Sequence, residues 1–307
     1  MIAINFNARS TETLAISHFI FKKIRYSQLF AYNMGMAGFD QYLDAQLLRG
    51  RSYFTSAEAL AELRVSPLAL KAAIGRMAKK QRVANLRHGF YLILRPEDRA
   101  AGAPDPARWI DPLMKYQGID YRVSLLRAAA FHGSSHQAAM TFQVVVPKQL
   151  RDFEIGRHRL QFVYQTPAAF AKVNQTDWLG NMKSEAGFAK VAGIELTLLD
   201  CARYFHKSAG INGLAQIVKD LGAQADARKL ARAAVVYENA SVRRLGYLLD
   251  QAGCKPQARA LEPFVKEAKT SLLLDPSVKP LIASLAEEAS RVAKWKLIIN
   301  EPVEADF

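Results

Sequence analysis

Cysteine is scarce in this chain, because its 307 residues include only Cys201 and Cys254. The two lie far apart, each within a helical pattern, so the sequence excludes the disulfide framework that stabilises many small secreted domains. We expect both thiols to be reduced and to lie in or near the core.

Long hydrophobic runs are also missing. No stretch approaches the roughly 18 apolar residues of a transmembrane helix. The N-terminal residues show no basic start, apolar run and small-residue cleavage site of a secretory signal. We therefore expect a cytoplasmic protein that has no membrane partner.

Recognisable catalytic patterns are missing as well. There is no Walker A or Rossmann glycine pattern and no G-x-S-x-G turn. His132 and His136 have a spacing that suits zinc, but Gly-Ser-Ser separates them and no acidic third ligand is near. Cys201, between Asp200 and His206, falls on the apolar face of its predicted helix and is better explained as a core residue. We expect no enzymatic activity, no metal site and no cofactor.

Acidic residues are absent between Leu63 and Pro96, although the stretch is rich in basic ones. These are Arg64, Lys71, Arg76, Lys79, Lys80, Arg82, Arg87 and Arg95. The whole chain has a formal net charge of +14. A solvated surface usually mixes both signs, so a segment of one sign favours a nucleic-acid partner.

Residues 55–94 carry the clearest local pattern. Thr55 and Glu58 can form a capping box at the start of one helix. Ser66 followed by Pro67 predicts the start of a second helix, with Leu70, Ile74 and Met77 as its buried stripe. A β-hairpin follows, with its turn at Arg87 to Gly89. Together with a helix over Ala37–Leu48, the pattern predicts a winged helix-turn-helix domain over residues 36–95.

The second helix of this domain is the predicted DNA-reading element. Its exposed face would carry small residues, among them Gly75, which costs about 1 kcal/mol relative to alanine within a helix. Close approach to DNA and close packing on another helix both explain such a glycine. The candidate DNA-binding residues are Ser66, Leu68, Lys71, Ala72, Gly75, Arg76, Lys79, Lys80, Arg82, Arg87 and His88. Arg76 is the candidate for a guanine contact.

The rest of the chain divides into three further segments. Residues 1–35 are an N-terminal extension of uncertain order; they form either a basic arm or a stretch that precedes a natural start at Met34 or Met36. Residues 96–108, with three prolines and a glycine, form a predicted linker. Residues 109–307 form the second domain.

Strand patterns precede helix patterns in this second domain, which predicts an α+β fold with a helix-rich end. A helix over Tyr121–Phe131 comes first. The expected strands are Thr141–Val146, Arg157–Tyr164 and Gly187–Val191, with a short helix or edge element at Pro167–Val173. The expected later helices are Ile194–Phe205, Asn212–Leu221, Ala225–Tyr237, Ser241–Ala252, Leu261–Lys269 and Val278–Trp295.

Four stretches resemble the AbiEi family, the antitoxins and transcriptional regulators of abortive-infection, type IV toxin–antitoxin systems in viral defence. They are LRHGFYLI at Leu86–Ile93, SLLRAAAFHG at Ser124–Gly133, IELTLLDCARY at Ile194–Tyr204 and VRRLGYLLDQAG at Val242–Gly253. The third resembles the family's E-x-T-L-L-D helix. The fourth resembles its R-L-G-Y-L-L-E helix, with Asp250 where glutamate is common.

The resemblance implies a bacterial autorepressor that binds inverted repeats of double-stranded DNA in its own promoter. It also implies an antitoxin that counteracts a nucleotidyltransferase-type toxin without requiring a stable complex. In the matched helices, we expect Arg243 and Arg244 to be exposed. We expect Glu195 and Asp200 to be helix-end or ion-pairing residues.

Two alternatives belong to other functional classes. One is a winged-helix protein with a nuclease-like or nucleotide-modifying second domain, which would need clustered acidic or metal-binding residues. The other is a winged helix that binds protein alone.

Overall fold

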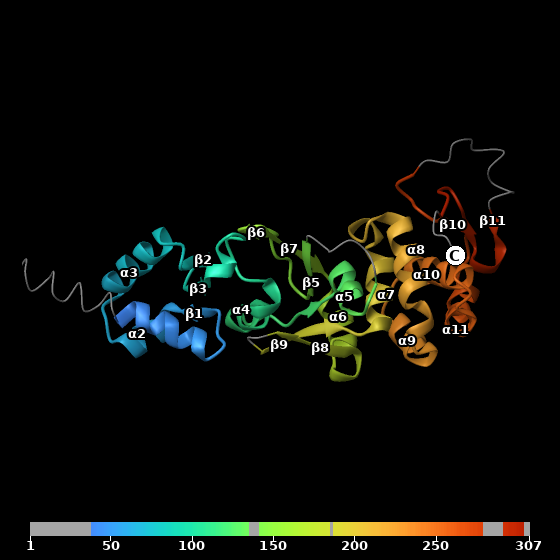
Figure 1. Ribbon diagram of the computed structural model, residues 1–307. Helices are drawn as coiled ribbons and strands as arrows, with labels where there is room; N and C mark the ends of the chain where they lie inside the picture. Colours follow the sequence, from blue (N-terminus) through green and yellow to red (C-terminus); the bar gives the residue numbers. More distant parts are fainter. Residues whose placement is uncertain (1–37, 135–140, 185–186, 279–290, 304–307) are drawn as a thin grey trace, which may run out of the picture. The chain divides into compact units, whose positions relative to one another are not determined.

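The computed structural model describes residues 38–134, 141–184, 187–278 and 291–303. The chain divides into two compact units between Pro104 and Asp105, here called the N-terminal unit and the C-terminal unit (Figure 1). Within the segment predicted as a linker, Pro96–Asp98 and Pro106–Arg108 form short 3-10 turns.

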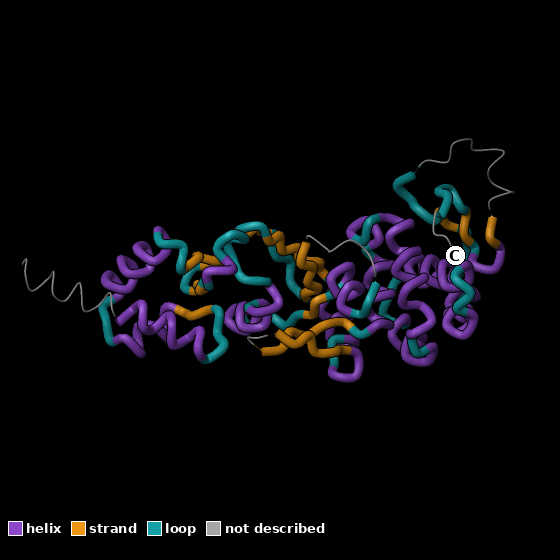
Figure 2. Tube along the Cα trace, in the orientation of Figure 1, coloured by secondary structure: helices purple, strands orange, loops and turns teal. Residues whose placement is uncertain are grey.

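In its described part, from residue 38 onwards, the N-terminal unit combines α-helices with a small antiparallel sheet (Figure 2). A helix over residues 38–48 comes first. It is followed by β1 (Tyr53–Thr55), α2 (Ser56–Leu63), α3 (Pro67–Lys79), β2 (Val83–Arg87) and β3 (Phe90–Ile93). The strand order is β1-β3-β2, so the hairpin of β2 and β3 is extended by a strand from before α2.

Local capping sets the start of both helices, as the sequence predicts. The amide of Glu58 donates to Thr55 Oγ1 at 3.2 Å, and the amide of Thr55 donates to Glu58 Oε2 at 2.8 Å. In α3, the amide of Ala69 donates to Ser66 Oγ at 3.2 Å, and Pro67 occupies the first turn. The two predicted start signals are therefore confirmed.

Aromatic residues fill the core of this unit. The ring of Phe54 packs edge-on against Phe39 and Tyr42, with both centroid distances at 5.8 Å, and stacks on Tyr91 at 5.2 Å. The predicted stripe of α3, Leu70, Ile74 and Met77, is buried in the same cluster. One face of α3 is thereby fixed against the core, which leaves its other face to solvent.

The C-terminal unit is built on a six-stranded mixed sheet. Its strands, in spatial order, are β6 (Phe153–Ile155), β7 (His158–Tyr164), β5 (Thr141–Val146), β4 (Arg122–Val123), β9 (Gly187–Ala192) and β8 (Leu179–Ser184). The pairs β5–β7 and β4–β9 are parallel, and the remaining pairs are antiparallel.

Helices lie before, between and after these strands. The shorter ones are α4 (Ile110–Gln117), α5 (Leu125–Phe131) and α6 (Pro167–Val173). After the sheet come α7 (Ile194–Arg203), α8 (Gly210–Leu221), α9 (Ala227–Ala234), α10 (Asn239–Gln251) and α11 (Lys255–Lys266) (Figure 1). The helix-rich part follows the sheet, so the mixed α+β prediction is confirmed for this unit.

Several element boundaries differ from the sequence prediction. The predicted helix Tyr121–Phe131 is split, because β4 joins the sheet before Ser124 caps α5. Strands β4, β6 and β8 were not predicted. They are short or carry polar residues, so their alternation is weak. Helix α11 begins at Lys255, earlier than predicted, with Pro256 in its first turn.

The end of the chain corrects a further prediction. Residues expected in the last part of a helix over Val278–Trp295 instead form β11 (Arg291–Val292) and a 3-10 turn, Ala293–Trp295. Together with β10 (Leu272–Leu273) and β12 (Leu297–Ile298), they form a small sheet of order β10-β12-β11. Lys296 adopts a positive φ of 48°, which ends any helical course at this point.

None of the helices within the described residues is long and apolar enough to span a bilayer.

Candidate functional site

The first candidate site is the face of α3 that no described residue covers. Leu68 is 79% exposed, and Ala72, Gly75 and Lys79 follow it on the same side of the helix, all exposed. This spacing of four, three and four residues defines a single helical face. We call these four residues the α3 outer face.

Gly75 decides between two interpretations of this face. A Cβ built at Gly75 would meet no atom within 4 Å among the residues the structure describes. Close packing against another described helix is therefore not the reason for this glycine. No atom of the described residues fills the space above it.

Basic side chains lie within and beside the α3 outer face. Lys71, Lys79 and Lys80 are exposed, and none of them forms an ion pair with a residue in the described ranges. Arg76 is half-buried along the side of the helix. On the hairpin, Arg87 is half-buried and His88 lies exposed in the turn.

Arg82 has a different position from the other candidates. Its Nη1 lies 2.5 Å from Asp40 Oδ1, and its Nη2 also pairs with Asp44 Oδ1. The two carboxylates lie one helical turn apart on the helix over residues 38–48, so Arg82 ties the start of β2 to that helix. Their i, i+4 spacing was the signal in the sequence that could have revealed this structural role.

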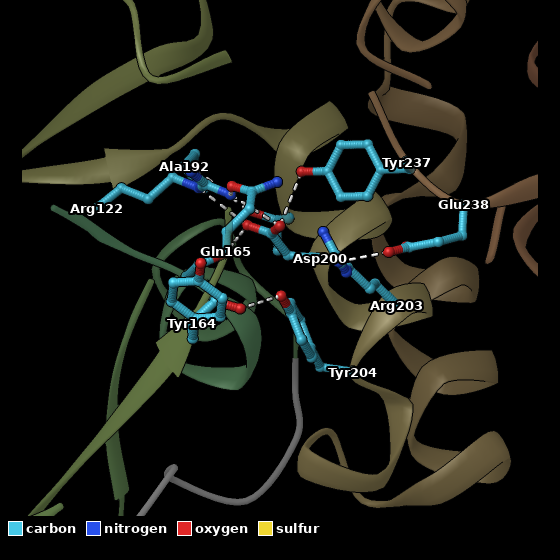
Figure 3. A network of polar contacts seen from close by, with 11 residues as sticks. Arg122, Tyr164, Gln165, Ala192, Asp200, Arg203, Tyr204, Tyr237 and Glu238 are labelled. Atoms are coloured by element: carbon cyan, nitrogen blue, oxygen red, sulfur yellow. Dashed lines mark hydrogen bonds and ion pairs between the residues drawn. The ribbon is translucent and has the colours of Figure 1, made fainter. Parts of the chain in front are cut away.

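A buried ion pair is the second candidate site (Figure 3). Arg122 on β4 and Asp200 on α7 are both fully buried. Arg122 Nε donates to Asp200 Oδ2 at 3.0 Å, and Nη2 donates to Oδ1 at 2.9 Å. This bidentate ion pair joins β4, at the centre of the sheet, to α7, the first helix after the sheet.

Every acceptor position of the Asp200 carboxylate is occupied. Besides the two bonds from Arg122, Oδ2 accepts from Ser124 Oγ at 2.6 Å and Oδ1 from Tyr237 OH at 2.8 Å. Arg122 Nη2 also donates to Gln165 Oε1 at 2.8 Å. A carboxylate has about four lone-pair sites, and these four hydrogen bonds within the protein use all of them.

The ionisation of the network follows from its partners. Burial acts to lower the pKa of Arg122, but attraction to Asp200 outweighs it and the pKa is raised. Burial, with the Asp200 charge adding to it, raises the pKa of Tyr237 well above its usual value. Arg122 therefore stays charged and Tyr237 stays a neutral donor.

The neighbouring thiol is chemically quiet. Burial raises the pKa of Cys201 to about 12, so the reactive thiolate is suppressed. Cys201 and Cys254 are both free and buried, as predicted. Among the described residues, no group of three His, Cys, Asp or Glu side chains is placed to hold a metal ion. His136 lies outside the described residues, and the His132 ring Nε2 lies 2.7 Å from the carbonyl of Ala192.

Two further bonds connect α7 to its neighbours (Figure 3). Tyr204 OH donates to the carbonyl of Tyr164 at 2.6 Å, which links α7 to β7. Arg203 pairs with Glu238 at the start of α10. The pair with Arg122 makes Asp200 an ion-pairing residue, as expected. Glu195 accepts from the amide of Asp226 at 2.9 Å, at the start of α9.

Two arginines of α10 overturn an expectation. Arg243 and Arg244 were expected to be exposed, but only 3% and 5% of their surfaces are accessible. Arg243 donates to the carbonyls of Thr270, Trp295 and Lys296. Arg243 therefore fixes Thr270, Trp295 and Lys296 against α10, because buried main-chain carbonyls need hydrogen-bond donors.

Arg244 has the same role one residue later. Its Nε donates to the carbonyl of Leu274 at 2.7 Å, and its guanidinium lies 4.6 Å from the centre of the Phe205 ring. Burial, the largest cause, lowers the pKa of both Arg243 and Arg244.

Gly246 and Asp250 on the same helix receive the Trp295 side chain. A Cβ at Gly246 would collide with three ring carbons of Trp295, which is fully buried. The indole Nε1 donates to Asp250 Oδ2 at 3.1 Å. The glycine of the R-R-L-G motif thus makes room for a tryptophan that lies 45 positions after Asp250 in the chain.

Comparison with protein families gives a match over these same elements. Residues 122–251 match the model of the AbiEi antitoxin C-terminal domain. This chain carries an AbiEi antitoxin C-terminal domain. The AbiEi domain begins at Arg122 and ends one residue after Asp250, so it contains the Arg122–Asp200 pair and the arginines of α10, whereas Trp295 lies beyond it.

The AbiEi domain indicates an antitoxin role in a type IV toxin–antitoxin system. Among solved structures, the crystal structure of the RV2827C protein from Mycobacterium tuberculosis is similar in fold, with a TM-score of 0.60 and 16% sequence identity. The match covers 85% of this chain and 90% of that one. No curated protein matches the chain.

Proposed function

We propose that the N-terminal unit is a winged helix-turn-helix that binds double-stranded DNA. In this proposal the protein represses its own operon, and its AbiEi domain counteracts a nucleotidyltransferase-type toxin. The observation that carries the DNA-binding part is the α3 outer face. Within the described residues this helical face is exposed, it has cations within and beside it, and its segment contains no acidic residue.

The order of elements supports this interpretation. The order is helix α2, a turn at Arg64–Ser66, helix α3 and the β2–β3 hairpin. In our proposal the two helices are the helix-turn-helix and the hairpin is the wing. In such folds the second helix enters the major groove with its N-terminal residues at the base edges. The α3 outer face is the part of α3 that is free to do so.

The proposed contacts divide by chemistry. Lys71, Lys79 and Lys80 would neutralise phosphates, which positions the protein without specifying a sequence. Arg87 and His88 on the hairpin would contact the backbone or the minor groove, and Ser66 lies at the start of α3. Arg76 remains the candidate for guanine. Arg82 is left out, because its charge is already paired with Asp40 and Asp44.

The partners follow from the same proposal. The DNA would be inverted repeats in the protein's own promoter, and the functional partner would be a toxin encoded next to it. A stable complex with that toxin is not required. The protein would act in the cytoplasm, where its operon lies.

One experiment tests both parts with the full chain. Cells carry the toxin gene, the antitoxin gene and a reporter under their shared promoter. We expect the protein to silence the reporter and to restore growth. The variant Lys79→Ala/Arg87→Ala should derepress the reporter and still restore growth, because neither residue lies in the AbiEi domain. Full repression by this variant would refute the DNA interface, and failure of the unaltered protein to restore growth would refute the antitoxin role.

A further inference from the structure

Leu68 is a large apolar residue left in solvent at the first turn of α3. It is 79% exposed. A single exposed leucine needs no explanation, but this one begins the α3 outer face. Ala72 and Gly75 continue the strip, so three consecutive positions on this face carry no polar side-chain atom.

The composition of this strip limits what it can read. In the major groove, base edges present hydrogen-bond donors and acceptors, and the thymine 5-methyl group is their apolar feature. Leu68 and Ala72 offer no side-chain donor or acceptor, so they cannot pair with adenine or guanine edges. Their side chains do match a methyl group.

Charge around the strip favours DNA as its occupant. Lys71 and Lys79 are exposed beside and beyond the apolar positions, and no acidic residue occurs between Leu63 and Pro96. An apolar strip between cations is complementary to a groove whose walls are phosphates and whose floor includes methyl groups. The open space over Gly75 allows the helix to lie close to that floor.

We propose that Leu68, supported by Ala72, packs against thymine 5-methyl groups in the operator and so determines part of its sequence specificity. This inference rests on the proposed DNA-binding function and adds the chemical feature that is read.

The test replaces thymine by deoxyuridine, which removes the methyl group and keeps base pairing. The full chain is titrated with its own promoter fragment and with fragments substituted at one thymine at a time. Burying one methyl predicts a loss of about fourfold in affinity at the contacted positions. The variant Leu68→Ala should bind the thymine fragment and the deoxyuridine fragments equally. Leu48→Ala, an equally conservative change at a leucine that is 90% exposed outside α3, should retain the fourfold difference.

Each outcome decides the matter. Uracil-insensitive binding at every position would overturn the inference and leave the DNA-binding proposal in place. A methyl effect that persists in Leu68→Ala would overturn the assignment to Leu68. Absence of binding to any promoter fragment would overturn the DNA-binding proposal and this inference with it.

Discussion

The indole ring of Trp295 occupies the space that a side chain at Gly246 would need. A Cβ there would collide with three atoms of the ring. The glycine lies within helix α10 of the AbiEi domain, and the tryptophan belongs to a segment beyond that domain. Gly246 in the domain's motif therefore leaves room for the side chain of Trp295, which lies outside the domain.

Gly246→Ala should destabilise the C-terminal unit. Overpacking a close-fitting contact costs about 1–3 kcal/mol, measured as a lower midpoint of urea unfolding. In a Trp295→Ala background the same change should cost little, because the colliding ring is gone. Gly75→Ala is the matched control: this helical glycine has open space, so alanine should stabilise the N-terminal unit by about 0.5–1 kcal/mol. Equal effects at both glycines would contradict the packing described for Trp295.

Asp200→Asn should be strongly destabilising. The change removes the charge that compensates the buried guanidinium of Arg122, and breaking a buried pair typically costs about 3–5 kcal/mol. Chemical unfolding of the full chain measures this loss. Asp105→Asn breaks the exposed pair with Arg127 and should cost less than about 1 kcal/mol. Similar losses for both variants would show that the buried network does not hold the fold together.

The raised pKa of Tyr237 predicts that the folded protein loses stability at high pH. Its folded pKa is raised above the unfolded value of about 10, so ionisation is easier in the unfolded chain. The contribution is fully present below about pH 10 and declines as pH rises beyond it. Unfolding midpoints between pH 8 and pH 11 should fall less steeply in Tyr237→Phe. Tyr164→Phe, at a tyrosine that is 40% exposed, serves as the control and should keep the steep decline. An unchanged slope in Tyr237→Phe would contradict the assignment.

Alanine substitution at Arg82 should lower stability, whereas alanine substitution at Lys79 should lower DNA affinity. Arg82→Ala removes two ion pairs to the helix over residues 38–48 and should lower the stability of the N-terminal unit by about 1 kcal/mol. Lys79→Ala should leave stability nearly unchanged and weaken promoter binding. Thermal unfolding and a DNA-binding titration on both variants separate the roles. Loss of stability in Lys79→Ala without loss of affinity would reverse our assignment.

Local signals account for what was predictable in this fold. The Thr55–Glu58 capping box and the Ser66–Pro67 start involve residues no more than three positions apart, and both are present. The buried stripe of α3 follows from helical spacing in the same way. The coarse order of strands before helices in the C-terminal unit required only periodicity.

The errors share a non-local cause. Arg243 has a hydrogen-bond partner 52 positions away, and Arg244 has one 30 positions away. A sequence pattern cannot show that such an arginine is buried, because its spacing on the helix says nothing of the segment that later covers it. Gly246 was the available clue, since a glycine within a helix permits another residue to approach closely.

The salt dependence of promoter binding tests the central claim most directly. Each phosphate contact should contribute about −0.9 to the slope of log affinity against log salt. Lys71, Lys79, Lys80 and Arg87 together predict a slope of roughly −4 for one bound copy. Lys79→Ala should reduce its magnitude by about one. A slope near zero in the unaltered protein would contradict the assignment of the α3 outer face and the cations within and beside it to DNA.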